Sequence, residues 1–122
     1  MPHITVLRKR ADFLRAAESG FKFVKFSVIV QSRKRTTIDS APASEIRIGF
    51  TATRNVGNAV IRNRTKRRMR AAVAKLIPEF GLPGCDYVII GRVQTRKERF
   101  TVLLRDMRHC LKRLADQMQT LS

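Results

Sequence analysis

The chain has 122 residues, of which 43% are hydrophobic, and its 26 basic and 9 acidic side chains leave a formal net charge of +17. This length fits one domain over residues 1–122, with roughly two-thirds of the unfolded surface buried on folding. So large a positive charge indicates a polyanionic partner, for which nucleic acid is the leading candidate. A membrane is the weaker candidate, because no basic helix pairs its charges with an exposed aromatic face.

The termini and cysteines indicate a cytoplasmic protein. The first ten residues lack the apolar segment of a signal peptide, and the longest apolar run, Tyr87 to Ile90, is too short to span a bilayer. Cys85 and Cys110 lie far apart without metal-binding or redox spacing, so we expect structural thiols in a reducing compartment.

Residues Ala11–Ser19 predict a short helix with Phe13, Leu14 and Ala17 facing inward, and Gly20 as its end.

Residues Phe21–Gln31 alternate in the manner of a strand. The face that we expect to be apolar carries Val24, Phe26, Val28 and Val30. The segment Arg33–Ser44 is polar and contains a proline, so it predicts a flexible loop whose basic triplet is a solvated strand end.

A second strand is predicted at Ile46–Thr51, where apolar and polar residues alternate. The basic helix follows at Asn58–Ile77, and Pro78 should end it. A third strand at Asp86–Arg92 is apolar on both faces, as expected of an interior strand.

The final segment predicts a long core helix. Thr95 and Glu98 have the spacing of a capping box at its start, and apolar residues from Phe100 to Met118 repeat at i, i+3, i+4 and i+7. The element order is therefore α-β-β-α-β-α, with one or two strands in the first strand region. This order predicts an α+β fold, an α/β sandwich in which three helices pack on a small mixed sheet. By the general rule the strand–helix–strand crossover would be right-handed.

The segment Gly57–Arg70 dominates the charge pattern, since six of the nine residues Arg62–Arg70 are basic and none is acidic. At about 100° per residue, Arg64 and Arg67 fall on the outer face of the helix. Arg62 and Lys66 fall on the side that carries the apolar residues of the second half. The first half of the helix therefore cannot pack on the core as the second half does, and it should project toward a polyanion.

A run of charges is ordinarily a solvated helix face. Here that explanation fails, because no acidic residue is present to compensate the cations at i,i+4 spacing, and phosphate binding is favoured. A basic zipper is excluded because Pro78 leaves no room for a heptad seam. Arginine also suits phosphate better than lysine does.

Intrinsic catalysis is not expected. The two histidines, His3 and His109, are far apart, and the acids are scattered singly, so the sequence shows neither a metal-ligand cluster nor a carboxylate pair.

A second nucleic-acid surface is indicated by Phe13, Phe23 and Ile29, apolar residues on elements that also carry Arg15 and Lys25. Apolar side chains flanked by cations suit single-stranded nucleic acid. For Phe13, a place in the core is the open alternative.

Three motifs together resemble the signature of the bacterial ribonuclease P protein subunit. They are Arg47-Ile-Gly-Phe-Thr51, Val56-Gly-Asn-Ala-Val60 and Arg62-Asn-Arg-Thr-Lys-Arg67. The likeness extends from the Asp12-Phe13 helix to the final helix, and so covers nearly the whole chain.

This resemblance implies an α/β sandwich with a left-handed βαβ crossover, which overrides the default handedness. It also implies a protein component of ribonuclease P, the endoribonuclease that matures tRNA 5′ ends. The RNA subunit would be catalytic and would use Mg²⁺, whereas the protein would bind no cofactor and would not cleave alone. The expected partners are the catalytic RNA and precursor tRNA, not a membrane or duplex DNA.

The resemblance also assigns residues. Those implied to bind the catalytic RNA are Arg62, Asn63, Arg64, Lys66, Arg67, Arg68 and Arg70. Those implied to bind the single-stranded 5′ leader, in a cleft between the first helix and the sheet, are Phe13, Ile29, Thr53, Arg54, Asn55 and Asn58. No residue is assigned to catalysis or to a metal.

Two departures from the family pattern affect the leader residues. Arg54-Asn55 replaces a pair of lysines that is common before the glycine motif, and Ala17 occupies a position that is often aromatic. Two alternative functions remain: a ribosomal or assembly protein that binds ribosomal RNA, and a nucleoid protein that binds duplex DNA.

Overall fold

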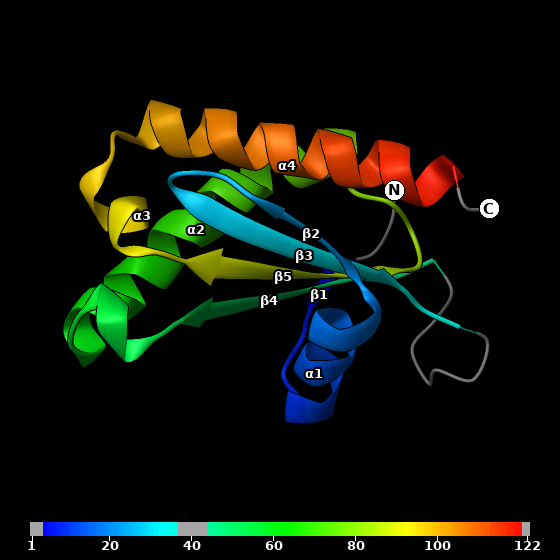
Figure 1. Cartoon of the computed structure of the whole chain (residues 1–122), viewed down its shortest axis with the longest axis horizontal. Helices are drawn as coiled ribbons and strands as arrows, with labels where there is room; N and C mark the ends of the chain where they lie inside the picture. Colours follow the sequence, from blue (N-terminus) through cyan, green and yellow to red (C-terminus); the bar gives the residue numbers. More distant parts are fainter. Residues whose placement is uncertain (1–3, 37–43, 121–122) are drawn as a thin grey trace.

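The computed structural model describes residues 4–36 and 44–120 and contains a five-stranded mixed sheet (Figure 1). The elements in chain order are β1 (Ile4–Val6), α1 (Arg10–Ser19), β2 (Phe21–Val24), β3 (Val28–Lys34), β4 (Ile46–Ala52), η1 (Arg54–Val56), α2 (Ala59–Phe80), β5 (Cys85–Gly91), α3 (Val93–Lys97) and α4 (Phe100–Thr120). The α+β class with a mixed sheet is confirmed.

The strands are arranged in the order β1-β4-β5-β3-β2. β4 is parallel to both β1 and β5, whereas β3 is antiparallel to both β5 and β2. β5 therefore lies in the interior of the sheet, as its continuous apolar run predicted.

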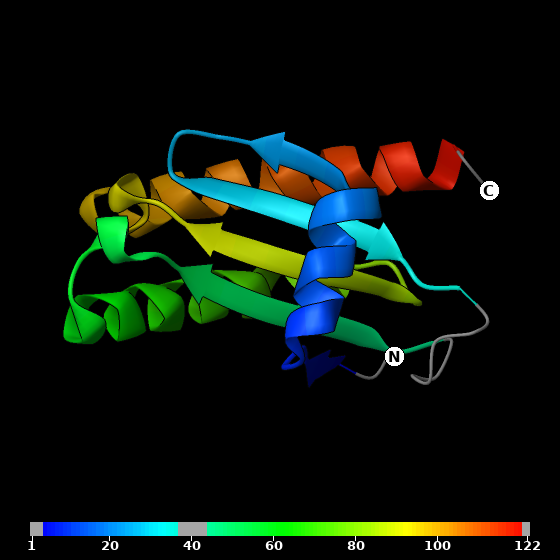
Figure 2. The ribbon, with the colours of Figure 1, turned by 60° about the horizontal axis from the view of Figure 1, so that its bottom comes forward.

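The helices divide between the two faces of the sheet, with α2 and α4 on one face and α1 on the other (Figures 1 and 2). The larger core lies under α2 and α4, and its fully buried residues include Met69, Tyr87 and Leu111. A smaller cluster of Leu7, Ala16 and Val88 lies under α1. Because α1 is a single short helix, it covers only part of its face.

The β4–α2–β5 connection is left-handed. Figure 2 views the sheet from the side of α1, with β4 and β5 running in the same direction and α2 behind them. Turned so that the two strands point upward, β5 lies to the right of β4 while the helix passes behind the sheet. The right-handed rule therefore fails here, and the handedness implied by the resemblance is correct.

The first strand region is a hairpin of two strands. The prediction that Val24, Phe26, Val28 and Val30 share one buried face is wrong for the residues next to the turn. The chain reverses between β2 and β3, where Lys25 N donates to Val28 O at 2.9 Å. Val28 and Val30 are buried as expected, but Val24 and Phe26 are 52% and 59% exposed. Alternation continues through the turn, so the pattern alone does not reveal that the chain has reversed.

Buried polar contacts hold this hairpin to distant elements. Asp106 on α4 accepts hydrogen bonds from Ser27 N at 3.1 Å and from Ser27 Oγ at 2.8 Å. Thr95 Oγ1 accepts from Arg92 N at 2.7 Å and donates to Ser27 O. Thr95 is thus inside the short helix α3 and does not cap the final helix, which begins at Phe100.

α1 begins one residue before the predicted start and has a different inner face. Asp12 and Ala16 are buried, whereas Leu14 and Ala17 point outward, and Phe13 is half-buried. The Asp12 carboxylate faces inward because Arg47 on β4 and Arg15 on α1 approach it at 3.4 and 3.0 Å.

α2 continues through Pro78 and ends at Phe80, one turn later than expected. A proline removes one donor, but Gly81 N still donates to Ile77 O at 2.8 Å, so the last turn closes without it.

The basic triplet after the first strand region is not a solvated strand end. Arg33 and Lys34 belong to β3, and Arg35 Nη1 contacts the fully buried carboxylate of Asp86 at 2.8 Å. Arg33 and Arg47 approach the same carboxylate at 3.6 and 2.6 Å. The rest of the expected loop, residues 37–43, lies outside the described residues.

Candidate nucleic-acid interfaces

Two local features fix where α2 begins. The Asn58 side chain accepts a hydrogen bond from Ile61 N at 3.0 Å and caps the helix. Gly57 before it has φ 153°, and a Cβ there would lie 2.7 Å from Ile61 Cγ2, so only glycine fits. Asn58, assigned above to leader binding, therefore also has a structural role.

The first half of α2 extends beyond the ends of β4 and β5 (Figure 1). Its apolar anchoring begins at Thr65 and continues at Met69, which are 1% and 0% exposed. The projecting half was therefore predicted correctly, although burial begins one turn before Met69. Thr65 is accommodated there because its hydroxyl donates to Ile61 O at 2.8 Å.

The seven residues that the resemblance assigned to the catalytic RNA are named here the arginine surface. They are Arg62, Asn63, Arg64, Lys66, Arg67, Arg68 and Arg70. Arg64 and Arg67 are exposed, and their side chains make no ion pair or hydrogen bond with another described residue. Arg70 is also exposed, with its guanidinium 5.3 Å from the centre of the Phe50 ring.

Arg68 is the member of the arginine surface that packs most closely on another element. It donates to the Glu98 carbonyl, and its guanidinium lies 5.8 Å from the centre of the Phe100 ring. Arg62 and Lys66 are half-buried, whereas Asn63 is exposed. The cations therefore occupy several sides of the helix, as the helical angles predicted.

A groove lined by α2, by Arg96 of α3 and by Phe100 at the start of α4 is named here the α2–α4 groove. Its volume is about 510 Å³, and its lining residues are Ile61, Arg64, Thr65, Arg67, Arg68, Ala71, Arg96 and Phe100. Sequence reasoning missed Arg96 and Phe100, which lie 28 and 32 residues after Arg68 along the chain. Only the packing of α3 and α4 beside α2 brings them to the arginines.

The opposite face of the sheet carries Phe13 and Ile29, and the remaining predicted residues, from Thr53 to Asn58, follow the end of β4. Phe13 lies directly over Gly49 of β4, where a Cβ would be 2.4 Å from Phe13 Cζ. Phe13 and Ile90 both pack against the small cluster under α1. Phe13 is thus partly in the core and partly at the surface, so its position is compatible with both alternatives that the sequence left open, a core residue and a contact for nucleic acid.

A half-buried row crosses the sheet beside α1. Ile29 of β3 pairs with Ile90 of β5, and Ile90 pairs with Thr51 of β4. Thr53 follows two residues after Thr51, and the exposed residues Arg54 and Asn55 come next. At about 3.3 Å per residue, this surface runs roughly 13 Å from Gly49, under Phe13, to Thr53. The residues of this surface are Phe13, Ile29, Thr51, Thr53, Arg54, Asn55 and Ile90, and together they are named here the α1 surface.

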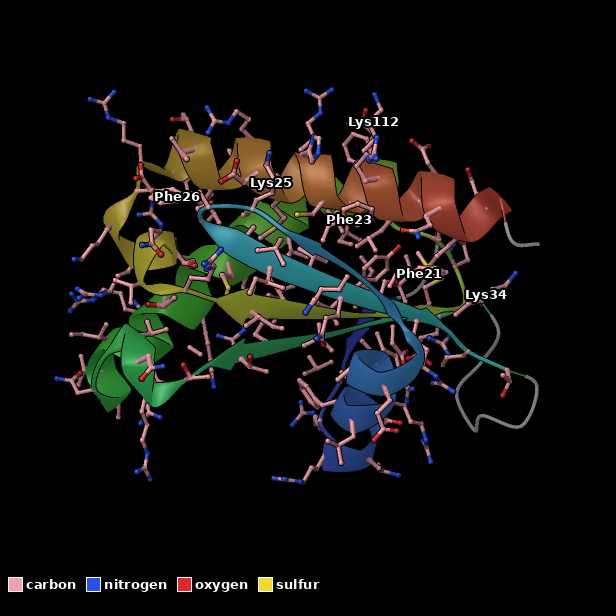
Figure 3. All side chains as sticks on the ribbon, viewed as in Figure 1. Phe21, Phe23, Lys25, Phe26, Lys34 and Lys112 are labelled. Carbon is pink, nitrogen blue, oxygen red and sulfur yellow. The ribbon has the colours of Figure 1, made fainter. Side chains whose placement is uncertain are left out.

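Phe23 does not belong to the α1 surface. It packs against the larger core, and the Arg113 guanidinium of α4 lies 5.7 Å from its ring centre. Figure 3 shows Phe21 and Phe23 beside α4, with Lys112 on the outer side of that helix. Grouping Phe23 with Phe13 and Ile29 was therefore wrong, because Phe23 of β2 packs on the α4 side of the sheet, whereas Phe13 of α1 and Ile29 of β3 lie on the α1 side.

The titratable side chains of the described residues were expected to form no metal-ligand cluster, and their positions can be stated directly. Residues 4–36 and 44–120 contain no cluster of three or more His, Cys, Asp or Glu side chains suited to a metal ion. Burial raises the pKa of the Cys85 thiol to about 11 and that of Cys110 to about 12, so both stay protonated near neutral pH. No described helix is both long and apolar enough to cross a membrane.

Comparison with known proteins shows one consistent relationship. The sequence model of the ribonuclease P family matches residues 1–115. The chain is 49% identical over 112 residues to the ribonuclease P protein component of Ruegeria pomeroyi, with 91% of this chain and 86% of the relative covered. It is 41% identical to the corresponding protein of Paramagnetospirillum magneticum, with 93% and 85% covered.

Solved structures agree with the sequence relatives. The RNase P protein from Thermotoga maritima superposes with a TM-score of 0.72 at 26% identity, covering 88% of this chain and 94% of that one. The Staphylococcus aureus RNase P protein has a TM-score of 0.70 at 26% identity, covering 88% and 92%.

Proposed function

The chain belongs to the ribonuclease P protein family, and from this premise we propose that it uses two separate surfaces to bind two RNAs. The arginine surface binds the catalytic RNA subunit, and the α1 surface binds the single-stranded 5′ leader of precursor tRNA. Family membership itself makes the chain a subunit of an endoribonuclease of tRNA processing, with RNA as its partner.

The observation that carries the proposal is the separation of these surfaces by the sheet. α2 packs on one face and projects past the strand ends, whereas α1 lies on the other face (Figures 1 and 2). The segment from Thr53 to Asn58 connects the end of β4 to the start of α2. One protein can therefore hold the catalytic RNA and position the leader beside it.

The two surfaces suit different RNA structures. Arg64 and Arg67 are exposed guanidiniums without protein partners among the described residues, which suits phosphates of a folded RNA. Phe13 and Ile29 offer half-buried apolar contact, and Arg54 and Asn55 offer charge and hydrogen bonds at the end of the row. This combination suits a single strand, whose bases are available for stacking.

In the proposed mechanism the RNA subunit and its Mg²⁺ carry out the hydrolysis, and the protein contributes binding and position. Neutralising phosphates lowers the repulsion between catalytic RNA and substrate, so less magnesium is required. Leader contact favours precursor over mature tRNA, because the mature product lacks the leader. Because the relatives are bacterial, we expect the complex in the cytoplasm.

The proposal is tested by cleavage of a precursor tRNA with a bacterial ribonuclease P RNA at low magnesium. Adding the protein should raise the cleavage rate and the precursor affinity, whereas the protein without RNA should cleave nothing. A rate and affinity that do not change on adding the protein would contradict the proposal. Ribosomal RNA and duplex DNA competitors test the two alternatives, and neither should displace the catalytic RNA at equal concentration.

A further inference from the structure

The α2–α4 groove has features that phosphate binding alone does not explain. We infer that it receives one unpaired nucleotide of the catalytic RNA, with the base on the apolar floor and the backbone at the arginine rim. This inference rests on the proposed function and extends it from a charged surface to a specific pocket.

The floor of the groove suits a planar base. Ile61 and Ala71 of α2 and the half-buried Phe100 ring of α4 contribute apolar surface. The volume of about 510 Å³ lies within the range of about 300 to 1,000 Å³ that small-ligand pockets occupy. A phosphate alone gains nothing from such a floor, whereas a base gains stacking and burial.

The rim of the groove is cationic on both sides. Arg64 and Arg67 come from α2, and Arg96 comes from α3. Arg96 Nε donates to Val56 O at 3.1 Å, which fixes the α3 side of the rim against the turn before α2. Phosphates on either side of a seated base would therefore meet cations from two elements.

Arg68 supplies a preformed wall. Its bond to the Glu98 carbonyl and its contact with the Phe100 ring hold the guanidinium plane in place before any RNA arrives. Its Nε is buried and has no hydrogen-bond partner among the described residues. A base in the groove would therefore meet a guanidinium plane whose position is already set.

An unpaired nucleotide fits better than a duplex. In A-form RNA the bases are stacked and paired, so the protein meets mainly phosphates and 2′-hydroxyls. A hollow lined by Phe100 and Ala71 would then stay empty. Unpaired bases in loops and bulges, by contrast, are routinely stacked on aromatic rings and guanidinium planes.

The test fills the groove without changing its charge. Ala71 is exposed on α2, so Ala71→Leu places a larger side chain in the groove and keeps a strong helix former. Ala74→Leu is the matched control, because Ala74 is exposed on the same helix and lies outside the groove. Circular dichroism and melting of both variants check that α2 is intact.

Ala71→Leu should weaken binding of the catalytic RNA about tenfold, in the range measured for loss of one stacked base. The slope of log K against log salt should not change, because no cation is lost. Ala74→Leu should bind as the unsubstituted protein does. Phe100→Leu, which removes the ring but not the apolar character, should repeat the loss.

Three results would overturn the inference: unchanged affinity for Ala71→Leu, equal loss for the two alanine variants, or a shallower salt slope. If the affinity is unchanged while the protein still stimulates cleavage at low magnesium, the pocket is wrong and the proposed function stands. If the unsubstituted protein does not stimulate cleavage at all, the proposed function is contradicted instead.

A second measurement separates a base from a free phosphate. Adenosine and uridine monophosphates should shift the amide resonances of Ala71 and Phe100 in titrations followed by nuclear magnetic resonance. Inorganic phosphate at the same concentration should shift mainly the rim, including Arg96. Identical shifts from phosphate and nucleotide would show an anion site only and would overturn the inference.

Discussion

At the scale of single residues, Asp86 shows how the fold uses part of its positive charge internally. Its carboxylate is fully buried in β5, where Arg35 and Arg47 contact it at 2.8 and 2.6 Å. Arg47 also reaches Asp12 of α1 at 3.4 Å. These arginines are therefore structural, and they join β4, β5 and the residue after β3 to α1.

The cluster was not predictable from the sequence. Asp86 lies 51 residues from Arg35 and 39 from Arg47, and a basic triplet beside a polar loop gives no sign of a distant carboxylate. Asp86 was assigned to a strand correctly, but no local pattern identified which of 26 basic residues would surround it.

Replacing Asp86 with Ala should therefore destabilise the fold severely. The substitution leaves buried guanidiniums without an anion, which typically costs about 3–5 kcal/mol. Urea unfolding followed by circular dichroism measures the change. Glu79→Ala, at an exposed acid of α2, is the control and should change the free energy of unfolding by less than about 0.5 kcal/mol. Equal effects of the two variants would refute this role.

The two buried thiols predict a loss of stability at high pH. Burial raises the folded-state pKa from 9.0 to about 11 for Cys85 and about 12 for Cys110. Above pH 9 the unfolded chain releases these protons while the folded protein retains them, so the free energy of unfolding should fall as the pH rises from 9 to 11. Urea unfolding of a Cys85→Ala, Cys110→Ala double variant should show a smaller fall. The same fall in both proteins would show that the two cysteines do not cause the loss of stability.

At the scale of elements, α2 combines what periodicity reveals with what only packing reveals. The helix, its cap region and its projecting first half follow from residue spacing and charge. Its end does not, because one missing donor at Pro78 costs little in a last turn that Gly81 closes. The α2–α4 groove cannot be predicted from residue spacing either, because tertiary packing brings α3 and Phe100 beside α2.

Removing the exposed cations of α2 should change the salt dependence of RNA binding. If Arg64 and Arg67 each neutralise one phosphate, the double alanine variant should lower the slope of log K against log salt by about 1.4–1.8. Fluorescence titration with the catalytic RNA at several salt concentrations measures this slope. Lys75→Ala, at an exposed cation of the anchored half, is the control and should leave the slope unchanged. A slope that neither variant alters would show that α2 does not contact phosphate.

The first strand region shows where alternation misleads. Residues Phe21–Gln31 keep a period of two, yet the chain reverses at Lys25–Ser27 without glycine or proline. The turn is held by Asp106, 79 residues away, rather than by local turn chemistry. The three-residue edge strand β1 was missed for a related reason, since its pairing with β4 is its main support.

At the scale of the whole molecule, the sheet separates the two proposed RNA surfaces. α2 and α4 lie on one face, and the single helix α1 lies on the other (Figure 2). A row including Ile29 and Thr51 thus stays half-buried beside Phe13. Charge and periodicity predicted a nucleic-acid-binding α+β protein, but the general rule for crossovers favoured the wrong handedness. The family resemblance corrected it.

The central claim is that each surface serves a different RNA. The most direct test is the ratio of precursor to mature tRNA affinity of the reconstituted enzyme, measured with every protein variant at saturation. Phe13→Ala should reduce this ratio several-fold, whereas Leu14→Ala, at the exposed neighbour on α1, should not. The Arg64→Ala, Arg67→Ala variant should need more protein to saturate the catalytic RNA yet keep the ratio. Equal reduction of the ratio by the Phe13 and the arginine variants would contradict the claim.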